Sequence, residues 1–111
     1  MKYHNKKTEV DGIVFDSKAE ARRYEELRMM EKMGLIHDLK RQVPYTLIKG
    51  DRWMSENNRK HRDTIYKADF TYFENGHLVV EDVKGVRTEG YRIKRELMKD
   101  RYGIEIREVR A

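Results

Sequence analysis

Apolar and polar residues alternate with a period of two in several short stretches of the chain, which is typical of half-buried strands. Two longer stretches carry apolar residues at helical spacing instead. The pattern predicts strands at 13–15, 39–48, 65–73, 77–84 and 104–109, and helices at about 17–33 and 88–102. This order of strand, helix, three strands, helix and strand predicts an α+β (α/β) fold in which helices flank a β-sheet.

Residue types that start and stop helices mark both predicted helices. Asp16 or Ser17 can cap the first helix, which runs to about Met33, where Gly34 supplies a C-terminal stop. The second helix, at 88–102, opens on a capping threonine and ends before a glycine. The ends of both helices can therefore be predicted from the sequence itself.

The remaining segments predict an arm, an edge strand and a loop within one domain that spans residues 1–111. Residues 1–9 are polar and basic, which indicates an N-terminal arm or a weak edge strand. Pro44 interrupts a strand pattern, so that strand is expected at a sheet edge or with a bulge. Residues 49–63 show no period and predict a long basic loop, and such loops are usually functional or mobile.

The dipeptide Asn75-Gly76 lies between two alternating runs and predicts a hairpin with a two-residue type I′ turn. Paired residue numbers in such a hairpin have a constant sum, so Asp69 is expected to face Asp82. Alternation predicts an apolar face made of Tyr66, Ala68, Phe70 and Tyr72, with Lys67, Asp69 and Thr71 on the other face. The turn alone therefore brings two carboxylates together.

Directly opposed carboxylates repel each other, because their Cβ atoms lie only about 4.5–5.5 Å apart. A raised pKa on one of them or a bound divalent cation can offset this repulsion, and Mg²⁺ is commonly held by one or two carboxylates. Lys84 shares the face of Asp82 and can balance the charge or take part in chemistry. The alternative is a solvated polar face on which the acidic pairing is accidental.

Glu20 lies in the apolar stripe of the first predicted helix, in line with Tyr24 and Leu27 at positions i, i+4 and i+7. A buried carboxylate needs hydrogen bonds, a cation or a proton. The alternative is a capping box with Ser17, in which Glu20 occupies the third helical position. Both interpretations can hold at once, because the helix dipole also favours an acidic residue in the first turn.

Composition narrows the class of protein. Charged residues make up 41 % of the chain, against roughly 25 % in typical domains, and the formal net charge is +5. A mildly basic chain suits a partner that carries phosphates. The absence of Cys excludes disulfides, thiolate metal sites and cysteine nucleophiles, and the four histidines lack zinc-site spacing. No apolar run is long enough for a membrane helix, so we expect a small soluble intracellular protein.

Glu20, Asp69 and the Asp-Val-Lys triplet at 82–84 together resemble the motif of the PD-(D/E)XK nuclease superfamily. The chain closely resembles a family of small phage-encoded Holliday-junction-resolvase-like endonucleases in three stretches, FDSKAEARRYEEL at 15–27, YKADFTY at 66–72 and VVEDVKG at 79–85. The resemblance covers nearly the whole chain except 49–63 and the first few residues. One departure is Ala68, which stands where the superfamily label has proline.

The resemblance implies a restriction-endonuclease-like core with a mixed sheet, and a role for each residue of the motif. Asp69 and Asp82 would bind Mg²⁺, for which Mn²⁺ can substitute, together with the backbone carbonyl of Val83. Glu20 would complete the acidic cluster directly or through a metal-bound water. Lys84 would orient or activate the attacking water and stabilise the charge of the phosphorane.

Three further features remain open at this stage. Glu81 is the main rival of Asp82 as second ligand, but its strand parity points away from Asp69. Gln42 can reach the site by an amide contact or make only a strand-edge hydrogen bond. Trp53 in the long loop can stack on a base or merely anchor that loop.

Basic residues on both helices are candidates for contacts to DNA phosphates, with a solvated helix face as the alternative for each. They are Lys18, Arg22 and Arg23 on the first helix and Lys94, Arg95 and Lys99 on the second.

We expect a Mg²⁺-dependent endodeoxyribonuclease that cuts branched DNA, as a Holliday junction resolvase of phage origin acting in the bacterial cytoplasm. Symmetric cleavage of a four-way junction needs two active sites, so a homodimer is expected. The alternatives are a nuclease or nickase of the same fold that acts on duplex or flap DNA, and a non-catalytic DNA-binding module with a structural ion.

Overall fold

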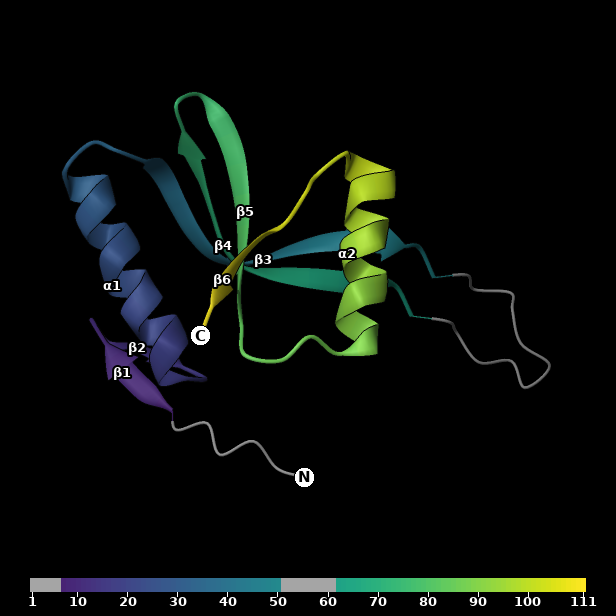
Figure 1. Ribbon diagram of the computed structural model, residues 1–111, viewed down its shortest axis with the longest axis horizontal. Helices are drawn as coiled ribbons and strands as arrows, with labels where there is room; N and C mark the ends of the chain where they lie inside the picture. The colour runs from purple at the N-terminus through teal and green to yellow at the C-terminus, as the bar shows by residue number, and fades with distance from the viewer. Residues whose placement is uncertain (1–6, 51–61) are drawn as a thin grey trace.

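Two helices and two β-sheets make up the part of the chain, residues 7–50 and 62–111, that this computed structural model describes (Figure 1). In chain order the elements are β1 (Thr8–Val10), β2 (Ile13–Phe15), α1 (Lys18–Lys32), β3 (His37–Ile48), β4 (Thr64–Glu74), β5 (His77–Lys84), α2 (Glu89–Tyr102) and β6 (Arg107–Arg110). Neither helix is long and apolar enough to cross a membrane.

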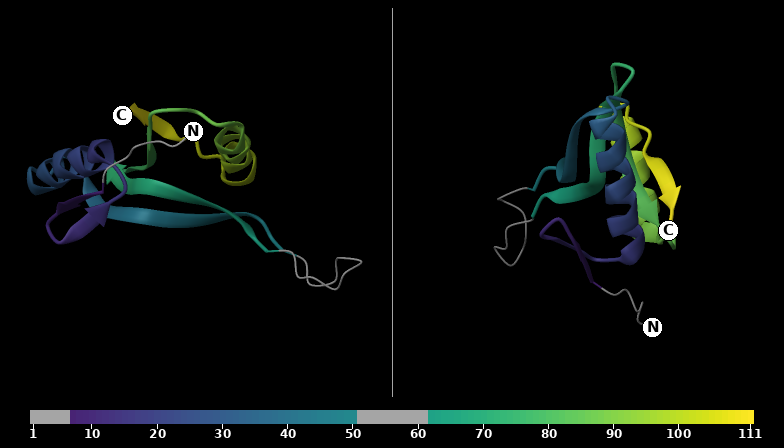
Figure 2. Two further views of the ribbon diagram at one scale, coloured as in Figure 1. Left: turned by 90° about the horizontal axis from the view of Figure 1, so that it is seen from below. Right: turned by 90° about the vertical axis from the view of Figure 1, so that its left-hand side faces the viewer.

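The larger sheet has four strands in the order β3-β4-β5-β6. Its first two pairs are antiparallel and β5 pairs with β6 in parallel, so the sheet is mixed. The short strands β1 and β2 form a separate antiparallel pair beside α1 (Figure 2). The predicted α+β class, a mixed sheet flanked by two helices, is therefore confirmed.

The helix ends follow the predicted capping residues. Ser17 is the N-cap of α1, and its side chain accepts a hydrogen bond of 3.1 Å from the backbone N–H of Glu20. Thr88 does the same for α2 with the N–H of Tyr91, also at 3.1 Å. Gly103 ends α2 with φ +67°, a left-handed conformation that glycine adopts without steric cost.

Of the two expectations for residues 1–9, an arm or a weak edge strand, the strand is present at residues 8–10 as β1, which pairs with 13–15 across a tight turn. The predicted start of the last strand was wrong. The last strand begins at Arg107 and not at Ile104. Ile104 and Ile106 are nevertheless half-buried against the core cluster under α2. Their alternation therefore reports packing against the core and not pairing in the sheet.

The hairpin between β4 and β5 has the predicted turn and register. Asn75 and Gly76 both have positive φ, at 54° and 79°, as a type I′ turn requires. Backbone pairing extends from Glu74 opposite His77 as far as Phe70 opposite Glu81. The next position along the hairpin is that of Asp69 and Asp82, so the turn positions these two residues as predicted.

Pro44 lies in β3, which is an edge strand of the larger sheet, as its ring requires. Within this strand Gln42 has φ +54°, a left-handed conformation that is uncommon for a residue with a side chain. The pairs Arg41–Phe70 and Val43–Ala68 lie on either side of it. In Figure 1, β3 and β4 bend near the middle of the molecule, with α1 beside one half and α2 beside the other.

This bend overturns the prediction of a single apolar face on β4. Phe70 and Tyr72 are buried in a cluster under α1, whereas Tyr66 and Ala68 belong to a second cluster under α2. Thr71, expected on the polar face, is buried as well. Strict alternation fails here because the strand turns from one cluster to the other at Asp69.

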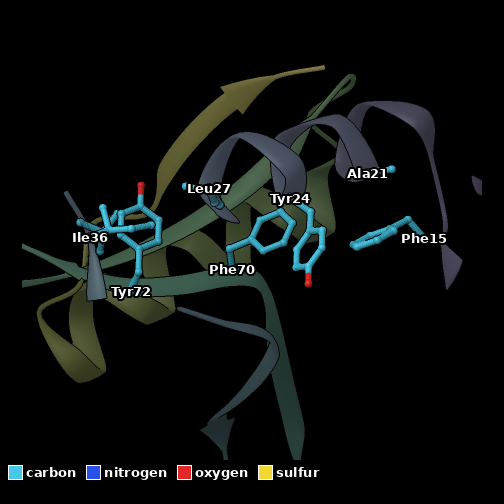
Figure 3. Packing of buried hydrophobic residues seen from close by; sticks show 8 residues of the cluster. Phe15, Ala21, Tyr24, Leu27, Ile36, Phe70 and Tyr72 are labelled. Carbon is cyan, nitrogen blue, oxygen red and sulfur yellow. The ribbon is translucent and has the colours of Figure 1, made fainter. Parts of the chain in front are cut away.

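The first cluster connects α1 to β2 and β4 through aromatic rings in contact. The ring of Tyr24 lies 5.0 Å from that of Phe15 and 6.4 Å from that of Phe70, measured between centroids (Figure 3). Leu27 and Ile36, both 0 % exposed, fill the space beside them. This packing fixes α1, and with it Glu20, relative to β4.

Candidate active site

A cleft of about 430 Å³ opens between the β4–β5 hairpin and α2. Asp69, Asp82 and Lys84 line it, together with the rings of Tyr66 and Tyr91. Three of the four residues that carry the predicted chemistry therefore share one cavity. The fourth, Glu20, comes from α1.

Asp69 is held at the bend of β4 by the neighbouring strand. Its Oδ2 atom accepts a hydrogen bond of 2.8 Å from the backbone N–H of Val83. Burial and, after it, the neighbouring carboxyls of Asp82 and Glu20 together raise the pKa of Asp69 to about 8, while the hydrogen bond from the Val83 N–H opposes the shift. The cleft therefore disfavours a second negative charge at Asp69, as the predicted repulsion requires.

Both carboxylate oxygens of Asp82 have partners. The hydroxyl of Tyr66 donates a hydrogen bond of 2.7 Å to Oδ2, and the ammonium of Lys84 lies 3.4 Å from Oδ1. The Asp82 residue is only 4 % exposed. Burial and the negative charge of Asp82 raise the pKa of Tyr66, so its hydroxyl remains a donor. Asp82 is thus fixed in one orientation.

Lys84 is positioned by an aromatic ring as well as by a carboxylate. Its Nζ lies 4.0 Å from the ring centroid of Tyr91, a cation–π geometry. The hydroxyl of Tyr91 donates a 2.8 Å hydrogen bond to Glu108 on β6, which anchors the ring. The ammonium is therefore held over the ring of Tyr91 on one side and beside Asp82 on the other.

Glu20 is buried, at 9 % exposure, near the N-terminus of α1. Gln42 donates from Nε2 to Glu20 Oε2 at 3.4 Å, so the amide contact exists and links the bend of β3 to this carboxylate. Burial and the charge of Asp16 raise the pKa of Glu20, while Arg41 opposes the shift. The predicted cap at Ser17 is present through the backbone of Glu20, which leaves the carboxylate to meet Gln42.

The described residues contain no preassembled group of three His, Cys, Asp or Glu side chains that could hold a metal ion. The structure brings together the Asp69–Asp82 pair, with Val83 between Asp82 and Lys84 in sequence. Two carboxylates with room for water suit Mg²⁺, which binds oxygen and retains several waters. Ligation of a cation by Asp69, Asp82, Glu20 and the Val83 carbonyl stays a prediction.

Glu81 points away from the cleft, as its strand parity predicts. It is 0 % exposed and accepts two hydrogen bonds from Arg23, from Nε at 2.8 Å and from Nη2 at 2.9 Å. The hydroxyl of Tyr72 also donates to it. Glu81 is therefore fully occupied in joining α1 to β5, and Asp82 is the carboxylate of β5 that faces the cleft.

The predicted DNA-contacting residues divide into three groups. Lys18 and Arg22 are exposed on α1, and Lys94 lines the cleft. Arg23 and Arg95 are instead engaged in ion pairs with Glu81 and Glu108. Lys99 lies 3.2 Å from Glu105. The basic residues of the long loop, with Trp53, lie mostly at 51–61, outside the described residues.

Sequence reasoning missed Tyr66, Tyr91 and Glu108. Tyr66 shares its strand parity with core residues, and only the bend turns it toward Asp82. Glu108 and Tyr91 are 17 positions apart and meet because β6 pairs with β5 in parallel, placing Glu108 beside Asp82. Neither contact leaves a local signal in the sequence.

Comparison with known families matches residues 1–110 to one family, described as "Protein of unknown function (DUF1064)". No curated protein matches the chain. No solved structure matches it.

Proposed function

The chain belongs to the DUF1064 family, and from the cleft we propose that it is a metal-dependent endonuclease that hydrolyses phosphodiester bonds in DNA. The proposal includes a restriction-endonuclease-like core and membership of the PD-(D/E)XK superfamily, which the sequence motif supports. The observation that carries it is the placement of Asp69, Asp82 and Lys84 in one cleft.

The two neighbouring carboxylates support the proposal that the cleft binds a divalent cation. Asp69 and Asp82 would hold Mg²⁺ or Mn²⁺ with the carbonyl of Val83, and Glu20 would contribute through a bound water. The bound cation would acidify a water and neutralise charge on the phosphate during in-line displacement. A cation would also offset the negative charges of Asp82 and Glu20, which add to burial in raising the pKa of Asp69.

Lys84 supplies positive charge beside the acidic pair. Because its ammonium is held by Asp82 at 3.4 Å and by the Tyr91 ring at 4.0 Å, it does not need to reorganise during the reaction. Its role in the proposal is to orient the attacking water and to stabilise the developing charge on the phosphate. Tyr66 keeps Asp82 in place by donating to its second oxygen.

The substrate we propose is branched DNA, and among branched structures we propose the four-way junction as the preferred one. The support for this choice is the sequence resemblance to junction-resolving endonucleases and the basic chain, with 25 Lys and Arg against 20 Asp and Glu. Cutting a junction symmetrically needs two such clefts, so the active form in this proposal is a homodimer.

A cleavage assay tests the proposal. Labelled four-way junction, flap and linear duplex are each incubated with the protein in Mg²⁺, with and without EDTA. We expect EDTA-sensitive cutting that is fastest on the junction. Equal rates on all three substrates would contradict the choice of branched DNA, and no cutting of any would contradict the nuclease.

A matched pair of variants tests the assigned cleft. Asp82→Asn should abolish cutting while junction binding is retained. Asp100→Asn, which makes the same change at an exposed position of α2, should cut like the wild type. Undiminished cutting by Asp82→Asn would show that the reaction takes place elsewhere.

A further inference from the structure

A second groove, of about 490 Å³, lies next to the active-site cleft. Its charged lining residues are Lys84, Arg87, Arg92, Glu108 and Arg110. Lys84 lines both cavities, so the groove and the cleft meet at the side chain that faces the acidic pair.

The groove is strongly positive. Its one carboxylate, Glu108, is already neutralised, because Arg87 lies 2.6 Å from Oε1 and Arg95 lies 2.9 Å from Oε2. Burial opposes the ionisation of Glu108. Hydrogen bonds from Tyr91, Arg95 and Arg87 outweigh this effect of burial, so they stabilise the ionised form and lower the pKa of Glu108. Arg92 and Arg110 therefore face solvent without a compensating negative charge in the lining.

Arg92 and Arg110 are the two exposed arginines of the groove that remain available. Eight ion pairs are formed within residues 7–50 and 62–111, and neither of these two arginines takes part in any of them. Arg92 comes from the first turns of α2, and Arg110 ends β6. Two guanidinium groups from different elements thus line one groove, and guanidinium groups match phosphate oxygens in geometry.

The backbone at one side of the groove is held by a hydrogen bond. Gly85 follows β5, and the nearest neighbour of a Cβ added there would be the Ala111 Cβ atom at 3.8 Å. The N–H of Ala111 donates to the carbonyl of Lys84 at 3.1 Å, which ties the end of the chain to β5. Gly85 contributes no side chain to this part of the lining.

We propose that this groove binds the sugar-phosphate backbone of the DNA strand that is cut, with Arg92 and Arg110 contacting phosphates next to the scissile one. The inference rests on the proposed function and adds to it the path of the strand. A continuous strand is favoured over a free anion because the groove shares the Lys84 side chain with the cleft, so a strand bound in the groove lies next to the cleft. Two of the phosphate contacts suggested by the sequence, Arg23 and Arg95, are instead engaged with carboxylates.

Binding without cleavage is the appropriate readout. Labelled four-way junction and linear duplex are titrated with protein in Ca²⁺ in place of Mg²⁺, and fluorescence anisotropy is followed at several salt concentrations. The test variant is Arg92→Ala/Arg110→Ala. The control is Lys32→Ala/Arg101→Ala, which removes the same charge from exposed positions in the last turns of the two helices.

We expect the test variant to bind DNA at least tenfold more weakly at low salt. Its slope of log K against log salt should fall by about 1.8, since each phosphate contact contributes about 0.9. Each single variant should account for about half of that change, which guards against a folding defect of the double variant. The control variant should retain the wild-type slope.

Three results would overturn the inference. They are an unchanged slope in the test variant, equal loss of affinity in the control, and binding of a polyglutamate peptide that matches DNA binding and is lost with the same two arginines. The outcome is separable from that of the nuclease proposal. If DNA binding depends on the two arginines but no DNA is cut in Mg²⁺, the groove is supported and the nuclease proposal is contradicted. If DNA is cut but its binding does not depend on the two arginines, the nuclease proposal is supported and the groove is contradicted.

Discussion

The carboxylate of Asp69 accepts a 2.8 Å hydrogen bond from the backbone N–H of Val83, across the β4–β5 hairpin. Backbone pairing between the two strands extends to Phe70 and Glu81, and this side-chain bond continues the connection one position further. The bond holds Asp69 beside Asp82 at the point where β4 bends toward α2. The acidic pair is thus built into the sheet and does not depend on a loop.

The raised pKa of Asp69 predicts how stability changes with pH in the absence of metal. Its folded-state pKa of about 8 lies above the ordinary value of 3.8, so between these values the folded protein keeps a proton that the unfolded chain has released. The free energy of unfolding should therefore fall as pH rises from about 4 to about 8. Asp69→Asn, which cannot ionise, should lose this part of the dependence.

Urea unfolding in EDTA at several pH values measures the effect. The variant should gain stability relative to the wild type as pH rises through this range. A constant difference between the two proteins would contradict the burial-driven shift at Asp69.

Tyr91 is predicted to act through Lys84 as a positioning residue. Tyr91→Phe keeps the ring under the ammonium and removes only the bond to Glu108, so cleavage should stay within about threefold of wild type. Tyr91→Leu removes the ring. The loss of a cation–π contact of about 1–2 kcal/mol corresponds to a rate about 5- to 30-fold lower.

Single-turnover cleavage of the junction, with binding measured separately in Ca²⁺, tests this role. The rate should drop in Tyr91→Leu while affinity stays the same. An equal loss of cleavage rate in Tyr91→Phe and Tyr91→Leu would contradict the prediction, because it would show that the hydroxyl and not the ring of Tyr91 is needed.

Arg23, which is partly exposed, forms an ion pair with the fully buried Glu81, and disruption of this pair should destabilise the fold. Arg23→Ala leaves the carboxylate of Glu81, at 0 % exposure, without its charged partner. Removing one member of a buried pair typically costs about 3–5 kcal/mol. The neighbouring Arg22→Ala, on the exposed face of α1, should change stability by less than about 0.5 kcal/mol.

Urea unfolding of the two variants at neutral pH gives the comparison. Similar stabilities for both would show that the pair contributes little, and that Glu81 is accommodated by Tyr72 alone.

Local signals made much of this fold predictable. The register of the β4–β5 hairpin followed from Asn75-Gly76 because a type I′ turn permits only one pairing. The helix ends followed from Ser17, Thr88 and Gly103, whose preferences depend on neighbouring backbone groups alone. These are also the features that bring Asp69 and Asp82 together.

Long-range geometry accounts for what could not be predicted. Gln42 has a positive φ in β3, opposite the bend of β4, and its residue type gives no indication of that conformation. Because of the bend, Tyr66 contacts Asp82 and not the cluster under α1. The anchoring of Tyr91 by Glu108 depends in turn on the parallel pairing of β6, which no local pattern specifies.

The central claim is that Asp69 and Asp82 together bind the cation that drives cleavage. The most direct measurement is the rate of junction cleavage as a function of Mg²⁺ concentration for wild type, Asp69→Asn, Asp82→Asn and the exposed control Asp100→Asn. We predict saturable Mg²⁺ dependence in the wild type and the control, and a loss of at least about 100-fold in both cleft variants at every concentration. Wild-type rates and Mg²⁺ dependence in either cleft variant would contradict the claim.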